Sequence, residues 1–293
     1  MRNLSEDNIT AVVLATLANT QDGRLKEIMT GLVKHLHAFI KEVNLTEAEW
    51  MAGIQFLTAT GQMCDDKRQE FILLSDTLGA TTTKDLINNR KPQGMTEYTI
   101  FGPFYREGAP ELPSNASIAG DTPGEPVIVS GRVFAPDGKP LANALLDVWH
   151  SDSEGFYDVQ LPGADINLRG RFRTDSEGRY TFCTIKPAFY PIPEDGPVGK
   201  MLRALGRHPY RPAHIHFIVS AEGYKTVITE LFAEGDPYLD SDVVFGVRDS
   251  LVVDFVRRDT QAEADRHNTA TPFYTVTYDF VLEPGDPKGL KDL

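Results

Sequence analysis

The chain has 293 residues, and its 29 Lys and Arg residues against 42 Asp and Glu residues give a formal net charge of −13. This acid excess argues against a nucleic-acid-binding protein, because such proteins neutralise phosphates with Lys and Arg. No run approaches the roughly 18 apolar residues of a membrane helix, the first ten residues lack the apolar region of a signal peptide, and only two cysteines are present, so we expect a cytoplasmic protein without disulfides.

The prolines divide the chain into two parts. Only one of the 19 prolines, Pro92, lies in residues 1–100, and the other 18 follow. Proline is costly inside helices but tolerated in loops and at strand edges. We therefore expect a helical domain in residues 1–100 and a strand-based domain in residues 101–293.

The first part shows helical periodicity. Asp22 can cap a helix that runs to about Val43, whose apolar residues recur at intervals of three and four. This apolar stripe suits either a core or a subunit interface. A capping box of Thr46 and Glu49 predicts a second helix from about Glu47, and its buried face should consist of Trp50, Met51, Ile54 and Leu57. We expect further helices at 8–18, 66–78 and 83–89.

The second part contains short runs rich in β-branched and aromatic residues, separated by turn signals such as Pro136-Asp137-Gly138. The predicted strands are 127–134, 144–150, 178–185, 214–220, 225–232, 250–256 and 273–282. Many short strands without helices between them suggest an antiparallel β-sandwich. The expected fold class is therefore α+β, with a helical domain before the sandwich.

Two histidines are the sharpest chemical feature. On a strand, His214 and His216 point to one face, and Ile215 points to the other. Two adjacent imidazoles suit a metal, but they also suit a polar patch, and a third ligand is not evident. Tyr157 and Tyr190 lie in loops, where a trivalent cation could deprotonate them. From residue types alone, packing tyrosines and a two-His-one-carboxylate Fe(II) site remain open.

Several blocks in fixed order carry a family resemblance. They are 99–105, 130–133, 147–150, 155–157, 171–175, 178–180, 190–199, 211–217 and 235–238. Through these blocks the chain resembles the intradiol ring-cleaving dioxygenases, the catechol 1,2-dioxygenase group. The resemblance covers essentially the whole chain, including its helical part.

The resemblance implies one non-haem Fe(III) ion per subunit. Tyr157 and His214 occupy the positions of the family's equatorial ligands, and Tyr190 and His216 occupy those of its axial ligands. Arg211 stands at the family's active-site arginine, where it would stabilise negative charge on the ring. Tyr190 would act in catalysis by taking a proton from the diol. We expect that Cys64, Cys183, His150, His208 and His267 are not ligands.

The resemblance also implies how the parts serve the enzyme. Residues 101–293 would form the β-sandwich Fe(III) catalytic domain. Residues 1–100 would form a dimerisation domain, so that the partners are a second copy of the chain and a phospholipid at the interface. The small-molecule partners would be an aromatic diol or triol and O2. Nucleic acid and membrane insertion are not expected.

Within the family, the chain is most similar to the hydroxyquinol 1,2-dioxygenases. Their substrate pocket implies a set of binding residues here: Leu73, Asp76, Ile100, Phe101, Gly102, Pro103, Phe104, Ile192, Pro193, Arg211 and Val244. Asp76 could accept a hydrogen bond from a third ring hydroxyl. The implied reaction converts 1,2,4-trihydroxybenzene and O2 into 3-hydroxy-cis,cis-muconate, the tautomer of maleylacetate. The alternatives are cleavage of catechol or chlorocatechol and, from another class, a non-catalytic transthyretin-like binding module.

Overall fold

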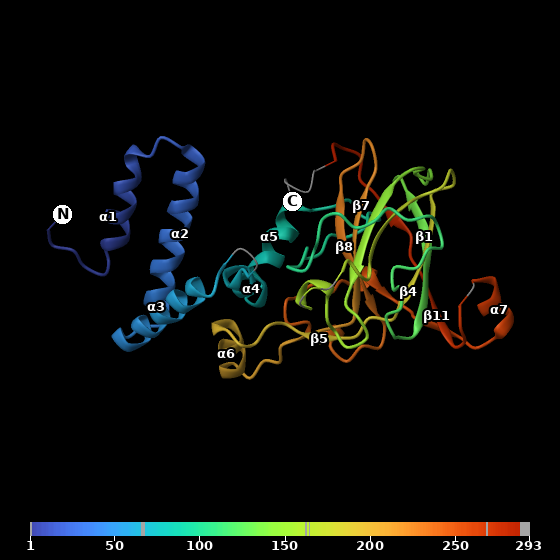
Figure 1. Cartoon of the computed structure of the whole chain (residues 1–293). Coiled ribbons are helices and arrows are strands. Elements are labelled where there is room, and N and C mark those ends of the chain that lie inside the picture. The colour runs from blue at the N-terminus through green and yellow to red at the C-terminus, as the bar shows by residue number, and fades with distance from the viewer. Residues whose placement is uncertain (1, 66–67, 162, 164, 268, 288–293) are drawn as a thin grey trace. The chain divides into compact units, whose positions relative to one another are not determined.

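The chain forms two compact units, Met1–Gln62 and Met63–Leu293. The computed structural model describes residues 2–65, 68–161, 163, 165–267 and 269–287 (Figure 1). The helices that follow residue 63 belong to the second unit, together with the strands. A division of domains at residue 100 therefore stays a prediction. No helix in these described ranges is long and apolar enough to cross a membrane.

The first unit consists of helices whose ends are set by the predicted caps. They are α1 (Ile9–Ala15), a 3-10 turn (Thr16–Asn19), α2 (Gly23–Glu42) and α3 (Glu47–Gln62). The Asp22 carboxylate accepts hydrogen bonds from the backbone N–H groups of Arg24 and Leu25 at 2.8 and 3.0 Å. The Thr46 backbone N–H donates to Glu49 at 2.9 Å, which confirms the capping box.

The apolar faces of these two long helices are exposed in the single chain. Helix α2 has no buried residue, and side chains of its stripe such as Leu32 and Phe39 are 55% and 52% exposed. The prediction of a buried face on α3 is wrong for the single chain, because Trp50 and Leu57 are 45% and 47% exposed. Both faces lack the packed core that an amphipathic helix needs from its own chain.

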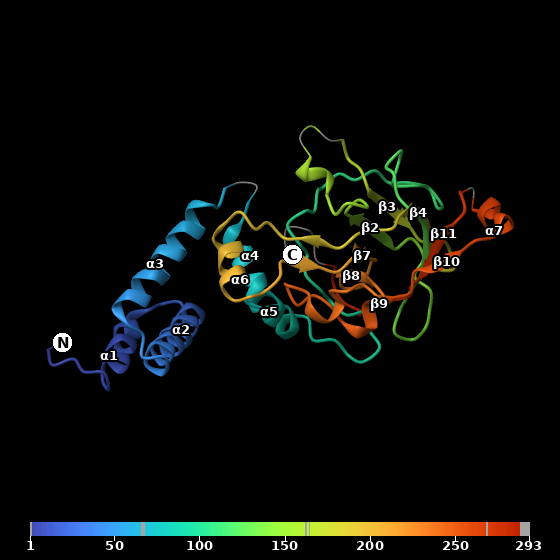
Figure 2. The ribbon, with the colours of Figure 1, turned by 90° about the horizontal axis from the view of Figure 1, so that it is seen from below.

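Among its described residues, the second unit contains four α-helices and three short 3-10 turns around two facing sheets. The helices are α4 (Glu70–Thr77), α5 (Ala80–Asn88), α6 (Pro197–Ala204) and α7 (Gln261–Arg266). Helix α4 packs against α5 and α6, and Figure 2 shows α4 and α6 side by side. Sequence patterns predicted α4 and α5 but missed α6 and α7.

Two five-stranded sheets build the sandwich. The first has the order β10-β11-β1-β12, with β4 pairing β1, and the second has the order β3-β2-β7-β8-β9. A separate ladder joins β5 to β6. The strands are β1 (Pro126–Phe134), β2 (Leu145–His150), β3 (Arg169–Arg173), β4 (Arg179–Ile185), β5 (Tyr190–Pro191), β6 (Tyr210–Arg211), β7 (His214–Ser220), β8 (Val227–Ala233), β9 (Val252–Val253), β10 (Val256–Arg258), β11 (Phe273–Thr277) and β12 (Phe280–Val281).

Alternate residues of the two sheets meet in one core. Strand β1 contributes Val127 and Val129, and strand β7 contributes Ile215 and Phe217. The α+β fold with a sandwich is confirmed, with one refinement. Strand β1 pairs β11 and β12 in parallel, and β8 pairs β9 in parallel, so the sheets are mixed rather than wholly antiparallel.

Candidate metal centre and substrate pocket

Strand β7 sets the two histidines of the candidate site. Its odd positions Ile215 and Phe217 enter the core, so His214 and His216 share the opposite face, as predicted. Both side chains are buried, and their Nε2 atoms lie 3.1 Å apart. The ring of His216 stacks on Trp149 with 3° between the planes. The pair is therefore held rigidly by its strand and its neighbours.

Two loops bring both tyrosines to the same point. Tyr157 follows the Gly155 turn, and Tyr190 begins β5. Their hydroxyl oxygens lie 3.3 Å apart. Gly155 has a φ of +91°, and a Cβ atom there would lie only 2.6 Å from the Cβ of Tyr190. A glycine is needed at this position, because the two loops could not otherwise approach so closely.

The Nε2 atom of His214 has more neighbours than one lone pair can serve. It lies 3.3 Å from Tyr157 Oη, 3.4 Å from Tyr190 Oη, 3.1 Å from His216 Nε2 and 3.3 Å from Arg211 Nη1. The Nδ1 atom of His214 lies 2.7 Å from the Pro212 carbonyl oxygen, so it carries the proton and leaves Nε2 as an acceptor. A cation among these atoms would satisfy the crowded lone pairs.

Burial keeps the four side chains neutral in the absence of such a cation. Burial lowers the pKa of His214 to about 4 and holds that of His216 well below its usual value. Burial also raises the pKa of both phenols, Tyr157 and Tyr190. Neutral imidazoles are the form that binds metals, whereas the phenols become ligands only if a strongly charged cation displaces their protons.

The spacing of the donor atoms fits a single ion. Ligand atoms about 2.1 Å from one ion, at angles between square and tetrahedral, lie roughly 3.0–3.4 Å apart, and the donor distances above fall in that range. Another grouping, His214, His216 and Glu230, has its ligand atoms within 4.8 Å of one another. Glu230, however, already accepts two hydrogen bonds from Arg211. The tyrosines are therefore the more available oxygen ligands.

Arg211 lies beside this centre on β6, opposite Tyr190 in the β5–β6 ladder. Its guanidinium is buried between Glu230, at 2.6 Å, and Asp242, at 3.1 Å. Burial works against its charge, but Asp242 and Glu230 outweigh that effect and hold the pKa of Arg211 well above its usual value. The remaining Nη1 contact points to His214 Nε2. A permanent positive charge therefore faces the point where the four donors meet.

Sequence reasoning missed Glu230 and Asp242. Glu230 is fully buried in β8, whose other residues are apolar or threonine, and it lies opposite His216 in register. A lone acid in such a strand is the one signal that could have revealed it. Asp242 lies in a loop after β8, and no local pattern marks it.

One side of the predicted pocket is an apolar cluster. Leu73 of α4 packs against a group formed by Ile100, Ile192, Leu202, Val243 and Val244. Four of the predicted pocket residues are thus brought together from separate segments. Pro193 is half-buried, and its part in the pocket stays a prediction.

The predicted pocket residues of the loop 100–104 lie beside the candidate metal centre. Phe104 stacks on Tyr157 with ring centroids 4.7 Å apart, and Phe101 packs edge-on against Trp149 at 5.9 Å. Gly102 has a φ of +75°, and a Cβ there would lie 3.2 Å from Cε1 of His216. The loop backbone therefore lies directly against the histidine. Pro103 is exposed.

Asp76 is buried on α4, 5% exposed. Its Oδ1 atom has no hydrogen-bond partner among the described residues. Burial raises the pKa of Asp76, while a hydrogen bond from Thr81 and the charge of Arg211 oppose that rise. An unpartnered buried carboxylate oxygen is costly unless a ligand group meets it.

His150 uses both ring nitrogens in hydrogen bonds to Ser151 and Thr184.

Known proteins share this arrangement of domains. A family model described as "Catechol dioxygenase N terminus" matches residues 22–96, and one described as "Dioxygenase" matches residues 100–284. The 6-chlorohydroxyquinol 1,2-dioxygenase of Cupriavidus pinatubonensis is 51% identical, over 97% of this chain and 99% of the relative. The hydroxyquinol 1,2-dioxygenase of a Rhizobium species is 50% identical, over 94% of this chain and 95% of the relative.

A solved structure agrees with these relatives. The hydroxyquinol 1,2-dioxygenase from Pseudomonas putida DLL-E4 superposes with a TM-score of 0.91 at 47% identity, covering 96% of this chain and 99% of that one. Both the helical part and the sandwich are included in matches of this extent. The chain therefore belongs to the family of intradiol ring-cleavage dioxygenases.

Proposed function

We propose that this chain holds one non-haem Fe(III) ion per subunit through Tyr157, Tyr190, His214 and His216. The observation that carries the proposal is the convergence of four buried donor atoms, with Tyr157 Oη, Tyr190 Oη and His216 Nε2 lying 3.1–3.4 Å from His214 Nε2. Two phenolates and two neutral imidazoles would offset two of the three charges of Fe(III). Phenolate oxygens are hard donors, which suits a trivalent ion better than Zn²⁺ with its nitrogen and sulfur preference.

The proposed substrate is hydroxyquinol, and both atoms of O2 enter its product, 3-hydroxy-cis,cis-muconate. Asp76 of α4 supports a substrate with a third ring hydroxyl, because the Asp76 Oδ1 atom is buried without a hydrogen-bond partner among the described residues. A hydroxyl at that place would donate to the carboxylate. Catechol lacks this hydroxyl and would leave the oxygen unpaired, which penalises its binding.

The chain's own residues have separate tasks in this proposal. Bound iron would supply the Lewis acidity and the redox activity that open the ring to O2. Tyr190 Oη would accept a proton from one diol hydroxyl. The fixed positive charge of Arg211 would stabilise negative charge that develops on the ring, a preorganised electrostatic role. Phe101, Phe104 and the cluster around Leu73 would exclude water from the ring.

Steady-state oxygen uptake tests the substrate. With hydroxyquinol, kcat/KM should exceed that for catechol and chlorocatechol by about 5- to 150-fold, since a lost hydrogen bond to a buried acceptor costs about 1–3 kcal/mol. Asp76→Ala should reduce this preference, whereas the exposed Asp195→Ala serves as the control. Equal or faster turnover of catechol by the wild-type enzyme would instead favour a catechol dioxygenase. If the protein turned over none of these diols, the result would favour the alternative of a non-catalytic transthyretin-like binding module.

We also propose a cytoplasmic homodimer that joins through the helices of the first unit and holds a phospholipid at the interface. The exposed apolar stripe of α2 and the exposed face of α3 support this assembly. Both cysteines, Cys64 and Cys183, form no disulfide, which suits a reducing compartment.

A further inference from the structure

The loop after β8 contains a residue in a strained backbone conformation, one position before Gly246, which lies against Arg211. Phe245 has a φ of +60°, a left-handed conformation that is unfavourable for a bulky side chain. Such residues persist only where the surroundings hold them, and they cluster at functional sites. Phe245 is half exposed to solvent, so burial of its own ring cannot be what holds it.

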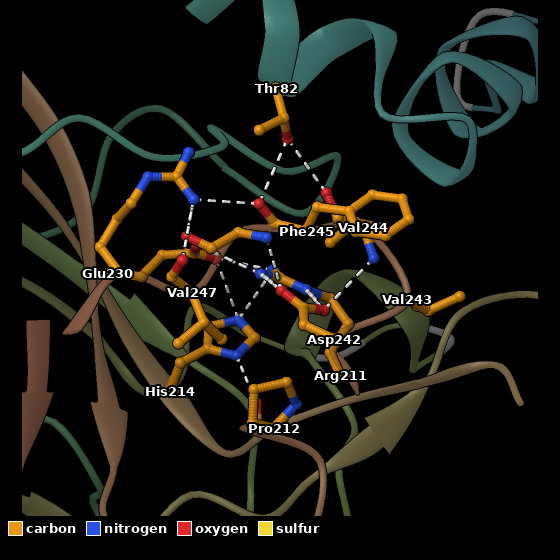
Figure 3. A network of polar contacts seen from close by, with 12 residues as sticks. Thr82, Arg211, Pro212, His214, Glu230, Asp242, Val243, Val244, Phe245 and Val247 are labelled. Atoms are coloured by element: carbon orange, nitrogen blue, oxygen red, sulfur yellow. Dashed lines mark hydrogen bonds and ion pairs between the residues drawn. The ribbon is translucent and has the colours of Figure 1, made fainter. Parts of the chain in front are cut away.

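Contacts from the helical side hold this segment instead (Figure 3). The Thr82 hydroxyl of α5 lies 3.1 Å from the Val244 carbonyl oxygen and 3.4 Å from that of Phe245. Arg207 donates to the carbonyl oxygens of Thr77 and Val243, and its guanidinium lies 5.1 Å from the centre of the Phe245 ring. The segment is thereby tied to the helices α4 and α5.

Contacts on the other side tie the same segment to Arg211. The Asp242 carboxylate accepts from Arg211 Nε and Nη2 at 3.2 and 3.1 Å, and also from the Gly246 backbone N–H at 2.8 Å. A Cβ atom at Gly246 would lie 2.6 Å from Arg211 Nη2. The backbone conformation of Gly246 is open to other residues, so space for the guanidinium is what requires glycine here.

The outer side of the segment 242–246 faces a cavity. A surface cavity of about 640 Å³ is lined by Thr82, Arg207, Asp242, Val243 and Phe245. Packing from outside therefore does not fix the segment, which is held by its polar contacts and by the inward packing of Val243 and Val244. Val244 of the same segment belongs to the predicted pocket, together with Leu73 of α4.

We infer that Thr82 and Asp242 are positioning residues that join the substrate pocket to Arg211. The Thr82 hydroxyl fixes the Val244 backbone relative to α5, and Val244 is a predicted pocket residue. Asp242, in the same segment, fixes the guanidinium of Arg211 through its hydrogen bonds. Recognition of the ring and stabilisation of its charge would then depend on one shared segment. This inference rests on the proposed function and adds residues that touch neither the substrate nor the four metal-binding side chains.

Three threonine variants test the first half of the inference. Thr82→Val removes the hydroxyl with little change in shape, and Thr82→Ser restores it. Thr83→Val is the matched control, because the exposed Thr83 hydroxyl bonds locally, to the carbonyl oxygen of Gly79, the N-cap of α5. Thr82→Val should lower kcat/KM for hydroxyquinol by about tenfold, the scale of a small misplacement, and should change the hydroxyquinol-to-catechol preference. Thr82→Ser and Thr83→Val should remain within about twofold of the wild type.

Two further variants test the contact with Arg211. Asp242→Asn and Gly246→Ala should lower kcat per bound iron by more than tenfold, while iron content and the visible absorption expected from phenolate-to-iron charge transfer stay unchanged. A purely structural role would lower the melting temperature and the iron content without altering kcat per iron or substrate preference. If Thr82→Val matched Thr83→Val, and Asp242→Asn kept wild-type kcat per iron, the inference would be overturned. A wild-type enzyme inactive on every diol would instead overturn the proposed function.

Discussion

The proposed ligand Tyr157 is a phenol, which binds metals poorly while it keeps its proton. A phenol in water has a pKa of about 10, and burial raises the pKa of Tyr157 well above that value. Only a strongly charged cation, bound at the same time by His214 and His216, would offset the free-energy cost of deprotonating this phenol. Metal binding and phenolate formation are thus one coupled event.

Replacement of this phenol should therefore release the metal. We expect that Tyr157→Phe retains less than about a tenth of the wild-type iron and loses the phenolate-to-iron absorption band, as measured by metal analysis and visible spectroscopy. Tyr180→Phe is the control, since Tyr180 is equally buried but donates to the Tyr278 carbonyl oxygen in the core. Full iron content with an unchanged band in Tyr157→Phe would contradict the proposed ligand set.

The site could be predicted from single residues only in part. Strand alternation correctly placed His214 and His216 on one face, because that rule is local. The tyrosines could be singled out only through the family resemblance, since their loops carry no period. Asp242 was out of reach, because it meets Arg211 through a loop 31 residues away in sequence. Long-range contacts of this kind have no local signal.

Among the elements, β1 shows why strand patterns predict positions better than pairings. The predicted strand 273–282 is divided into β11 and β12, and both pair with β1 in parallel. Between them the Tyr278 carbonyl oxygen approaches Gly131, where a Cβ would lie 1.7 Å away. The break therefore results from a contact with a distant strand. Strand β3 was missed because Arg-Gly-Arg-Phe-Arg contains a single apolar residue. Helix α6 was missed because it is only eight residues long, although Val198, Met201 and Leu202 have helical spacing.

Strand β2 also carries a buried acid with a consequence for stability. Burial raises the pKa of Asp147 to about 6, although a hydrogen bond from Tyr105 at 2.9 Å opposes the rise. The folded chain therefore binds this proton more tightly than the unfolded chain, whose aspartate has a pKa near 4. The contribution of Asp147 to the free energy of unfolding should be greatest below about pH 4 and should fall as the pH rises to about 6.

Replacement of this acid by a neutral side chain removes that dependence. In urea unfolding, the stability of Asp147→Asn relative to wild type should increase between pH 4 and pH 7, by at most about 3 kcal/mol. Asp137→Asn is the control, because a hydrogen bond from Lys139 lowers the pKa of that exposed carboxylate, so its titration lies below about pH 4 and its relative stability should stay constant between pH 4 and pH 7. A relative stability of Asp147→Asn that did not change with pH would show that the folded state leaves this proton unperturbed.

For the whole molecule, the proline count first separated a helical part from a strand-based part. The structure adds that the apolar stripe of α2 is mostly exposed within its own chain, since the helix has no buried residue. An exposed stripe of this length is unfavourable in water and marks an interaction surface. A second copy is the occupant we propose, because an isologous pairing of identical stripes satisfies both at once.

Charge placed in the stripe should therefore separate the subunits without emptying the iron site. Leu32→Glu combined with Leu36→Glu puts two carboxylates where the stripe is 55% and 50% exposed in the single chain, and a buried unpaired charge is strongly unfavourable. Light scattering coupled to size exclusion should report a dimer for wild type and a monomer for this variant. Lys34→Glu is the control, because it changes charge on α2 outside the stripe.

Iron content should be equal in all three proteins, since no proposed ligand lies in residues 1–62. A double variant that stayed dimeric would place the subunit interface outside the α2 stripe.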